Sequence, residues 1–137
     1  LKKRPSNREW TTLLSVKPSD YWNTHYLFGK PSAMKIKKPG NDFIHRILIN
    51  SIAPFAFFYG RKQKEHRYRD YAIQMLEQLP SENNQVINKW DRAGLSAENA
   101  FESQSILYLY KHYCKSRKCL DCQIGNYVIL HGEKNQL

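Results

Sequence analysis

Apolar side chains recur three or four residues apart along much of this chain, which is the spacing of one buried face of an α-helix. The most regular example covers residues 68–79, and another begins after Asn41 or Asp42. The sequence has no run in which apolar and polar residues alternate as they do in a strand. The pattern therefore predicts an all-α fold, a single compact domain over 1–137 with about five helices joined by short loops.

Helix-breaking and capping residues divide the first half of the chain. A short helical piece is expected over 10–16, and a second helix from Ser19 to about Gly29, where glycine can end it. Residues 30–40 read as a loop. The helix after this loop is expected to kink or break at Pro54, because proline removes a backbone donor and clashes with the preceding turn. Its buried face is expected to hold Phe43, Ile44, Ile47, Leu48, Ile52 and Phe55, with the chain leaving the helix at Gly60.

The second half follows the same rules. Pro80 and Ser81 are expected to end the helix over 68–79 and to cap a shorter one. Gly94 is placed to close that shorter helix in a left-handed conformation. Ser96 is expected to cap the last long helix, 97–113, which leads into a tail that contains the cysteines.

The balance of charge favours a polyanionic partner. The chain has 22 Lys and Arg against 12 Asp and Glu, a formal net charge of +10. Such a charge favours nucleic acid, an anionic membrane surface or an acidic protein surface, although an inert basic surface is the alternative. The residues that we expect to contact nucleic acid form three clusters: Lys35, Lys37 and Lys38; Arg61, Lys62, Lys64, Arg67 and Arg69; Lys115, Arg117 and Lys118.

Other classes of protein fit less well. The longest apolar run, 47–59, is far shorter than the roughly 20 residues that span a bilayer, so no membrane partner is expected. The first residues are polar and do not resemble a signal peptide. An odd number of cysteines, 3, does not make a disulfide framework and favours reduced thiols in the cytoplasm. The chain starts with Leu1 in place of Met, so we expect a fragment.

Three strings carry a family resemblance: SDYWNTHYLFGKPS (19–32), LEQLPSENN (76–84) and AFESQSILYLYKHYCKSRKCLDCQIG (100–125). Together they resemble the C-terminal part of an uncharacterised bacterial family, domain of unknown function 2851, over about 19–125. The resemblance implies a fragment of a longer protein, to the rest of which this chain would bind. It carries over no catalytic residue, and we expect no catalysis within this chain.

The cysteines suggest a possible metal site. Cys114, Cys119 and Cys122 follow the spacing Cys-x4-Cys-x2-Cys, and a Cys-x2-Cys turn places two sulfurs on one tetrahedral ion. His112 or His131 would supply the fourth ligand of a zinc site. The neighbouring cations Lys115, Arg117 and Lys118 are expected to lower the thiol pKa values.

Two alternatives to zinc stand beside it. The spacing also matches the first cysteines of a plant-type ferredoxin, and is similar to the tail of iron–sulfur DNA glycosylases, but a fourth cysteine is absent. The favoured interpretation is that these are ordinary free cysteines that pack under the last helix, and that the chain holds no cofactor.

Two polar groups on predicted helices are further candidates. Asp20 and His25 could serve acid–base chemistry, but a capping Asp and a partly buried His are the favoured interpretation. Gln104 falls on an apolar face and needs a partner, which we expect to be a neighbouring backbone group.

Three functions follow, in order of preference. The first is a non-catalytic accessory domain that assists nucleic-acid binding by a larger protein. The second is a structural or protein-interaction domain, which predicts an exposed apolar patch. The third is an enzyme, which would require Asp20 and His25 to meet another titratable group in one cleft.

Overall fold

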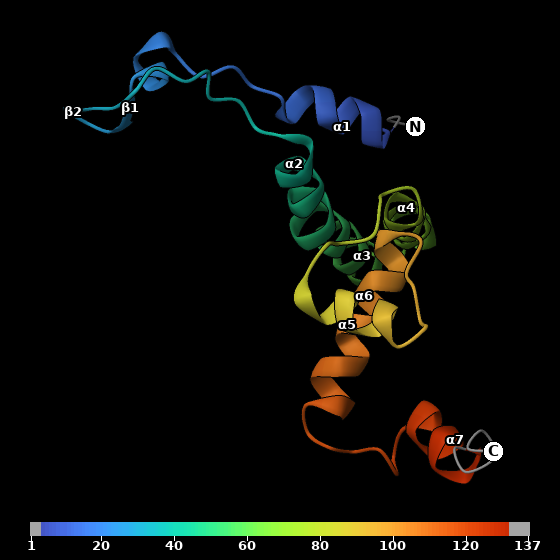
Figure 1. The fold of residues 1–137 in the computed structure, drawn as a ribbon. Helices are drawn as coiled ribbons and strands as arrows, with labels where there is room; N and C mark the ends of the chain where they lie inside the picture. The colour runs from blue at the N-terminus through green and yellow to red at the C-terminus, as the bar shows by residue number, and fades with distance from the viewer. Residues whose placement is uncertain (1–3, 132–137) are drawn as a thin grey trace. The chain divides into compact units, whose positions relative to one another are not determined.

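The computed structural model describes residues 4–131, and these are mostly α-helical (Figure 1). The all-α prediction is confirmed, with one small two-stranded hairpin added. The chain forms two compact units, Leu1–Leu79 and Pro80–Leu137, so the single domain over 1–137 stays a prediction. Residues 1–3, the start of the polar N-terminal segment, lie outside the described residues. None of the helices within 4–131 has the length and apolar character needed to cross a membrane.

The elements of the first unit are α1 (Asn7–Leu14), a 3₁₀ turn η1 (Asp20–Asn23), β1 (His25–Leu27), β2 (Lys30–Pro31), α2 (Asn41–Ile47), a π turn η2 (Leu48–Ile52), α3 (Ala53–Lys62) and α4 (His66–Glu77). Those of the second unit are α5 (Gln85–Arg92), α6 (Ala100–Leu109), a π turn η3 (Tyr110–Cys114) and α7 (Gln123–His131).

Helix α1 starts at a capping box. The Ser6 hydroxyl accepts from the Glu9 backbone N–H at 3.2 Å, and the Glu9 carboxylate accepts from the Ser6 backbone N–H at 2.7 Å. Two N–H groups that the first turn leaves without helical partners are thereby satisfied. The helix consequently begins three residues before the apolar piece expected over 10–16.

The helix expected over 19–29 is wrong. The chain makes the 3₁₀ turn η1 and then the antiparallel pair of β1 and β2, in which His25 is opposite Pro31 and Leu27 is opposite Lys30. Gly29 has φ +67°, a left-handed conformation that turns the hairpin and that few other residues adopt. The run of aromatic and apolar residues before Gly29 is too short for its spacing to distinguish a strand from a helix.

The π turn η2 changes which face of α3 is buried. The backbone N–H of Ala53 bonds to the carbonyl of Leu48, five residues back, so the turn holds one residue more than an α-turn. The extra residue accommodates Pro54, at the place where we predicted a kink or break. It also shifts the buried positions by one. After the turn, Phe55, predicted to be buried, is exposed, and Ala53 and Ala56 are buried. Before the turn, Ile44 and Leu48 are buried as predicted, but Phe43 is exposed, and its exposure is not an effect of the π turn.

Gly60 joins α3 to α4. We expected the chain to leave the helix at this residue, but α3 continues to Lys62 and Gly60 is buried. A Cβ atom at Gly60 would lie 2.8 Å from the Tyr68 Cβ and 2.9 Å from the Glu65 carbonyl oxygen. The two helices therefore approach at a point where only a hydrogen atom fits, and the Glu65 N–H bonds to the Gly60 carbonyl at 2.8 Å. Helix α4 packs on α3 and η2, and its buried residues are Ala72 and Met75, as its periodicity predicted.

Helices α5 and α6 of the second unit are both capped by asparagine. The Asn84 side chain accepts from the N–H groups of Val86 and Ile87, and Asn99 accepts from that of Glu102. Ser81 and Ser96, predicted as the caps, lie outside these positions, because an asparagine stands directly before each helix and bonds its first turn.

Two other predictions for the second unit are confirmed. Gly94 closes α5 with φ +89°, as expected. The predicted long helix is present as α6 followed by η3. The predicted tail is wrong in part, because the chain forms a further helix, α7. The fully buried Ser103 hydroxyl donates to the Ala100 carbonyl and accepts from the Glu82 N–H.

We predict that Gly60→Ala destabilises the chain. Alanine favours a helix over glycine by up to about 1 kcal/mol, but the added methyl group meets backbone atoms that cannot move aside, and overpacking costs about 1–3 kcal/mol. The free energy of unfolding should fall by about 1–2 kcal/mol in urea denaturation. Lys62→Ala, an exposed change in the same helix, is the control. An unchanged or higher midpoint for Gly60→Ala would contradict the close helix contact.

Candidate nucleic-acid interface and cysteine cavity

The turn between α3 and α4 gathers exposed cations. Arg61 and Lys62 are exposed in the last turn of α3, and Lys64 follows with φ +55°. Arg67 forms an ion pair with the Glu65 carboxylate, which raises the pKa of its guanidinium. Arg69 is half-buried, with its guanidinium 5.5 Å from the centre of the Phe57 ring. Among the described residues, this predicted cluster therefore divides into two cations that have partners, Arg67 and Arg69, and three exposed cations for which no partner is seen.

An aromatic cavity lies directly beside this turn. It has a volume of about 350 Å³. The Tyr59 and Tyr68 rings meet edge to face at 5.0 Å, and the Arg4 guanidinium lies 4.6 Å from the centre of the Tyr68 ring. The lining residues are Arg4, Pro5, Trp10, Ile52, Phe55, Ala56, Tyr59, Tyr68 and Tyr71. Arg4 and Trp10 were not among the predicted site residues, because neither belongs to a cluster in the sequence.

The Tyr71 hydroxyl holds the N-terminal segment on this cavity. It accepts from the Trp10 indole N–H at 2.6 Å and donates to the Pro5 carbonyl at 2.6 Å. Burial raises the pKa of Tyr71, and the hydrogen bond from Trp10 opposes that shift. The hydroxyl therefore stays protonated, as its donation to Pro5 requires, and Arg4 is kept near the tyrosine rings.

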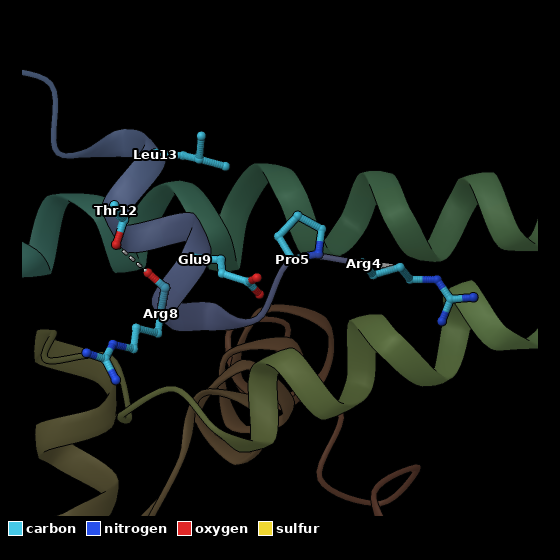
Figure 2. Close-up of a pocket in the computed structure, with 6 residues that line it drawn as sticks. All are labelled: Arg4, Pro5, Arg8, Glu9, Thr12 and Leu13. Carbon is cyan, nitrogen blue, oxygen red and sulfur yellow. Dashed lines mark hydrogen bonds between the residues drawn. The ribbon is translucent and has the colours of Figure 1, made fainter. Parts of the chain in front are cut away.

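A second hollow, of about 490 Å³, lies on the N-terminal segment (Figure 2). Its lining comes entirely from residues 4–13, and Figure 2 shows Arg4 and Arg8 pointing in opposite directions, with Glu9 between them. The two cations do not converge on a common point, and the Glu9 carboxylate is used by the capping box. This hollow is therefore a weaker anion site than the α3–α4 turn.

The first predicted basic cluster follows the hairpin. Lys35 and Lys38 are exposed. The Lys37 ammonium donates to the His25 carbonyl at 2.6 Å and lies 3.5 Å from the centre of the Tyr26 ring. Lys37 thus holds the returning chain on the hairpin, and the exposed Lys35 and Lys38 are the cations of this cluster that can meet a phosphate.

The three cysteines line one cavity of about 300 Å³ in the second unit. Gly125 makes this cavity possible, since a Cβ there would lie 2.5 Å from the Cys119 carbonyl oxygen. Helix α7 can therefore lie directly on the loop that carries Cys119. Cys122 is buried, Cys114 is half-buried and Cys119 is exposed. The remaining lining is apolar except for Lys118: Trp90, Leu109, Tyr113, Ile124, Val128 and Ile129.

The expectation that neighbouring cations lower the thiol pKa values is wrong for Cys114. Its pKa is raised, first by burial and then by the neighbouring Cys122 and Cys119. Lys115 and Arg117 are exposed, and charges surrounded by water act weakly on a half-buried thiol. Arg117 occupies a left-handed conformation, φ +53°, in the turn after η3.

The structure does not bring the predicted histidines to the cysteines. His112 packs against the Tyr108 ring at 4.2 Å, and His131 stacks on Tyr127 with its Nδ1 atom 2.9 Å from the Tyr127 carbonyl oxygen. Neither lines the cysteine cavity. Within residues 4–131, no group of three or more His, Cys, Asp or Glu side chains is arranged to hold a metal ion. Zinc stays a prediction, to be tested by metal analysis of protein purified without an affinity tag.

The remaining candidates have local partners. The Asp20 carboxylate accepts from the Asn23 side chain at 3.4 Å, and the His25 ring stacks on Tyr21 at 4.0 Å. His25 is half-buried, as the structural interpretation expected. The contact of Asp20 is with a side chain and not with a backbone N–H, so its capping role stays a prediction. Gln104 donates to the Glu82 carboxylate, so its partner is a side chain and not the backbone group that we predicted.

We predict that Cys114 reacts slowly with iodoacetamide. Only the thiolate attacks, and a raised pKa lowers the thiolate fraction at neutral pH. Its rate at pH 7 should be several-fold below that of free cysteine and should still increase above the ordinary thiol pKa of about 8.5. Mass spectrometry of the alkylated peptides gives the rate at each cysteine, and exposed Cys119 reports whether the reagent reaches the loop. Faster alkylation at Cys114 than of free cysteine would contradict the buried environment.

Comparison with known proteins identifies the family. No curated protein and no solved structure matches the chain. The family model described as protein of unknown function (DUF2851) matches residues 1–85, which is more than half of the 137 residues. The match is N-terminal and not C-terminal, so the extent expected for the resemblance, 19–125, is wrong: residues 86–125 lie outside it. The family resemblance itself is confirmed, and the chain belongs to the DUF2851 family.

Proposed function

We propose that this chain is a non-catalytic helical accessory domain that assists nucleic-acid binding by a larger protein. The observation that carries the proposal is the backbone at two of the predicted cations. Lys64 and Arg117 adopt left-handed conformations, with φ +55° and +53°. Glycine or asparagine would adopt this conformation at lower cost. A left-handed backbone costs most other residues roughly 1–2 kcal/mol, because the Cβ atom comes too close to the following carbonyl oxygen. A cation at each of these positions is better explained by binding than by folding.

The setting of Lys64 supports the same proposal. Arg61 and Lys62 lie in the preceding turn, where cations also stabilise the negative end of a helix dipole. That effect is limited to the last turn of the helix and gives no reason for the strained Lys64. The Tyr59 and Tyr68 rings beside this turn add aromatic surface, which nucleic-acid-binding proteins combine with cations.

A second candidate is a protein-interaction domain, and exposed aromatic residues favour it. Phe55 and Phe58 of α3 are 72% and 63% exposed. Exposed apolar surface of this kind is typical of a contact with another protein. An acidic protein surface, or the rest of a longer chain that contains this one, would be the partner.

The proposal is tested by the salt dependence of binding. The full chain should bind a random oligonucleotide at low salt and lose affinity steeply as salt is added. Each phosphate contact contributes about 0.7–0.9 to the slope of log K against log salt concentration. A triple variant, Arg61→Ala, Lys62→Ala and Lys64→Gly, should therefore lower that slope by roughly 2–3 in fluorescence anisotropy titrations.

The control variant removes the same number of charges elsewhere. Arg46→Ala, Lys89→Ala and Arg92→Ala are exposed changes outside the three predicted clusters and outside the hollow of the N-terminal segment. Equal losses in the two variants would show that net charge alone attracts the oligonucleotide. Absence of binding by the unchanged chain at low salt would refute the proposed function, and binding of an acidic protein in its place would support the second candidate.

A further inference from the structure

The segment from η1 to Lys37, which we call the aromatic finger (residues 20–37), is held together by its own contacts. The Ser32 N–H bonds to the Thr24 carbonyl at 2.7 Å, and the Lys35 N–H bonds to the Asn23 carbonyl at 2.8 Å. The bond from the Lys37 ammonium to the His25 carbonyl closes the segment. The finger therefore has a defined conformation although it buries no residue completely.

The tip of the finger presents one aromatic ring to solvent. Phe28 is 82% exposed. Its ring meets the Trp22 ring at 5.0 Å, tilted by 64°, and the Tyr21 ring at 6.1 Å. The Tyr21 hydroxyl also accepts from the Gly29 N–H at 2.8 Å, which fixes the turn beside Phe28. The Phe28 ring is thus supported on one side and open to water over most of its surface.

The finger and the residues next to it are rich in cations. Residues 17–38 contain five lysines and one acidic residue, Asp20, which bonds Asn23. Lys30, Lys35 and Lys38 are exposed. Lys37 covers the Tyr26 ring, so Phe28 is the better placed of the exposed aromatic rings to receive a flat partner. The ligand that fits carries negative charge along a chain and a flat ring that can stack, which describes an unpaired nucleotide.

We propose that the aromatic finger binds single-stranded nucleic acid, with an unpaired base stacked on Phe28 and phosphates bound by Lys30 and Lys35 of the finger and by Lys38 directly after it. This inference rests on the proposed function and adds to it a strand class and a base-contacting residue. A duplex is a poorer partner, because its bases must be unstacked before a ring can reach them, at a cost of a few kcal/mol per step. An anionic membrane would accept the same charges, but insertion into lipid needs no ring held by Trp22 and Tyr21.

The test compares three probes with the full chain: a fluorescent oligothymidylate, the same length of duplex, and phosphatidylserine vesicles. The oligothymidylate should bind more tightly than the duplex. Phe28→Ala should weaken its binding about ten-fold or more, the loss expected for one stacked base. Phe28→Trp, which enlarges the stacking surface, should bind at least as tightly as the unchanged chain. The matched control is Phe58→Ala, another exposed phenylalanine, and it should leave the affinity unchanged.

The outcomes separate the two proposals. If the oligothymidylate binds but Phe28→Ala matches the unchanged chain, the finger inference is overturned and the proposed function stands. Equal or tighter binding of the duplex also overturns the inference. Binding to vesicles that depends on Phe28, with none to the oligothymidylate, assigns the finger to a membrane surface. If no oligonucleotide binds, the proposed function falls and the inference falls with it.

Discussion

The contact of Gly60 with the first turn of α4 is the constraint on which the first unit depends. It brings the backbone of α3 next to Glu65 and Tyr68, and so sets the sharp turn that carries Arg61, Lys62 and Lys64. The same approach places Tyr59 against Tyr68, which receives the guanidinium of Arg4. The Tyr71 hydroxyl then fixes Pro5 and Trp10, and with them α1. The aromatic cavity and the basic turn are therefore two results of one close packing contact.

The second unit repeats this local design with different chemistry. A helical segment ends at η3, the chain passes through a left-handed cation, Arg117, and the next helix approaches through a glycine, Gly125. In the first unit the cavity beside such a turn is lined by tyrosines, and in the second by cysteines. In both units a side chain carries positive charge at a position where the backbone favours glycine. That coincidence gives the proposed function more support than the net charge of the chain, which is compatible with an inert surface.

Features that depend on the residues of one helix could be predicted from the sequence. Features that depend on how one element packs against another could not. The periodicity of 68–79 and the closure at Gly94 depend on one helix each, and both were predicted correctly. The hairpin was missed because helix and strand patterns cannot be told apart over so few apolar residues. Phe55 was predicted to be buried because the prediction assumed a constant helical period, whereas the π turn η2 adds one residue before Phe55.

The candidate site shows the same division. The spacing of the cysteines predicted that they lie together, and they line one cavity. Their distance from His112 and His131, and the burial that raises the Cys114 pKa, depend on α7, which the sequence did not reveal as a helix. Arg4 and Phe28 could not be singled out, since their surroundings come from tertiary packing or from a hairpin that was read as a helix.

The π turns have a consequence for chain length. A π turn is an α-helix that holds one additional residue, so the segments on either side keep the faces that they would show in an uninterrupted helix one residue shorter. Removing one residue from Tyr110–Cys114 would restore the α-helical pattern and leave α6 and the following loop in their angular positions. Removing one residue within α6 would instead rotate everything after it by about 100°. Chains that differ by one residue at such a turn can therefore share this fold, and a sequence alignment across it must place its gap there.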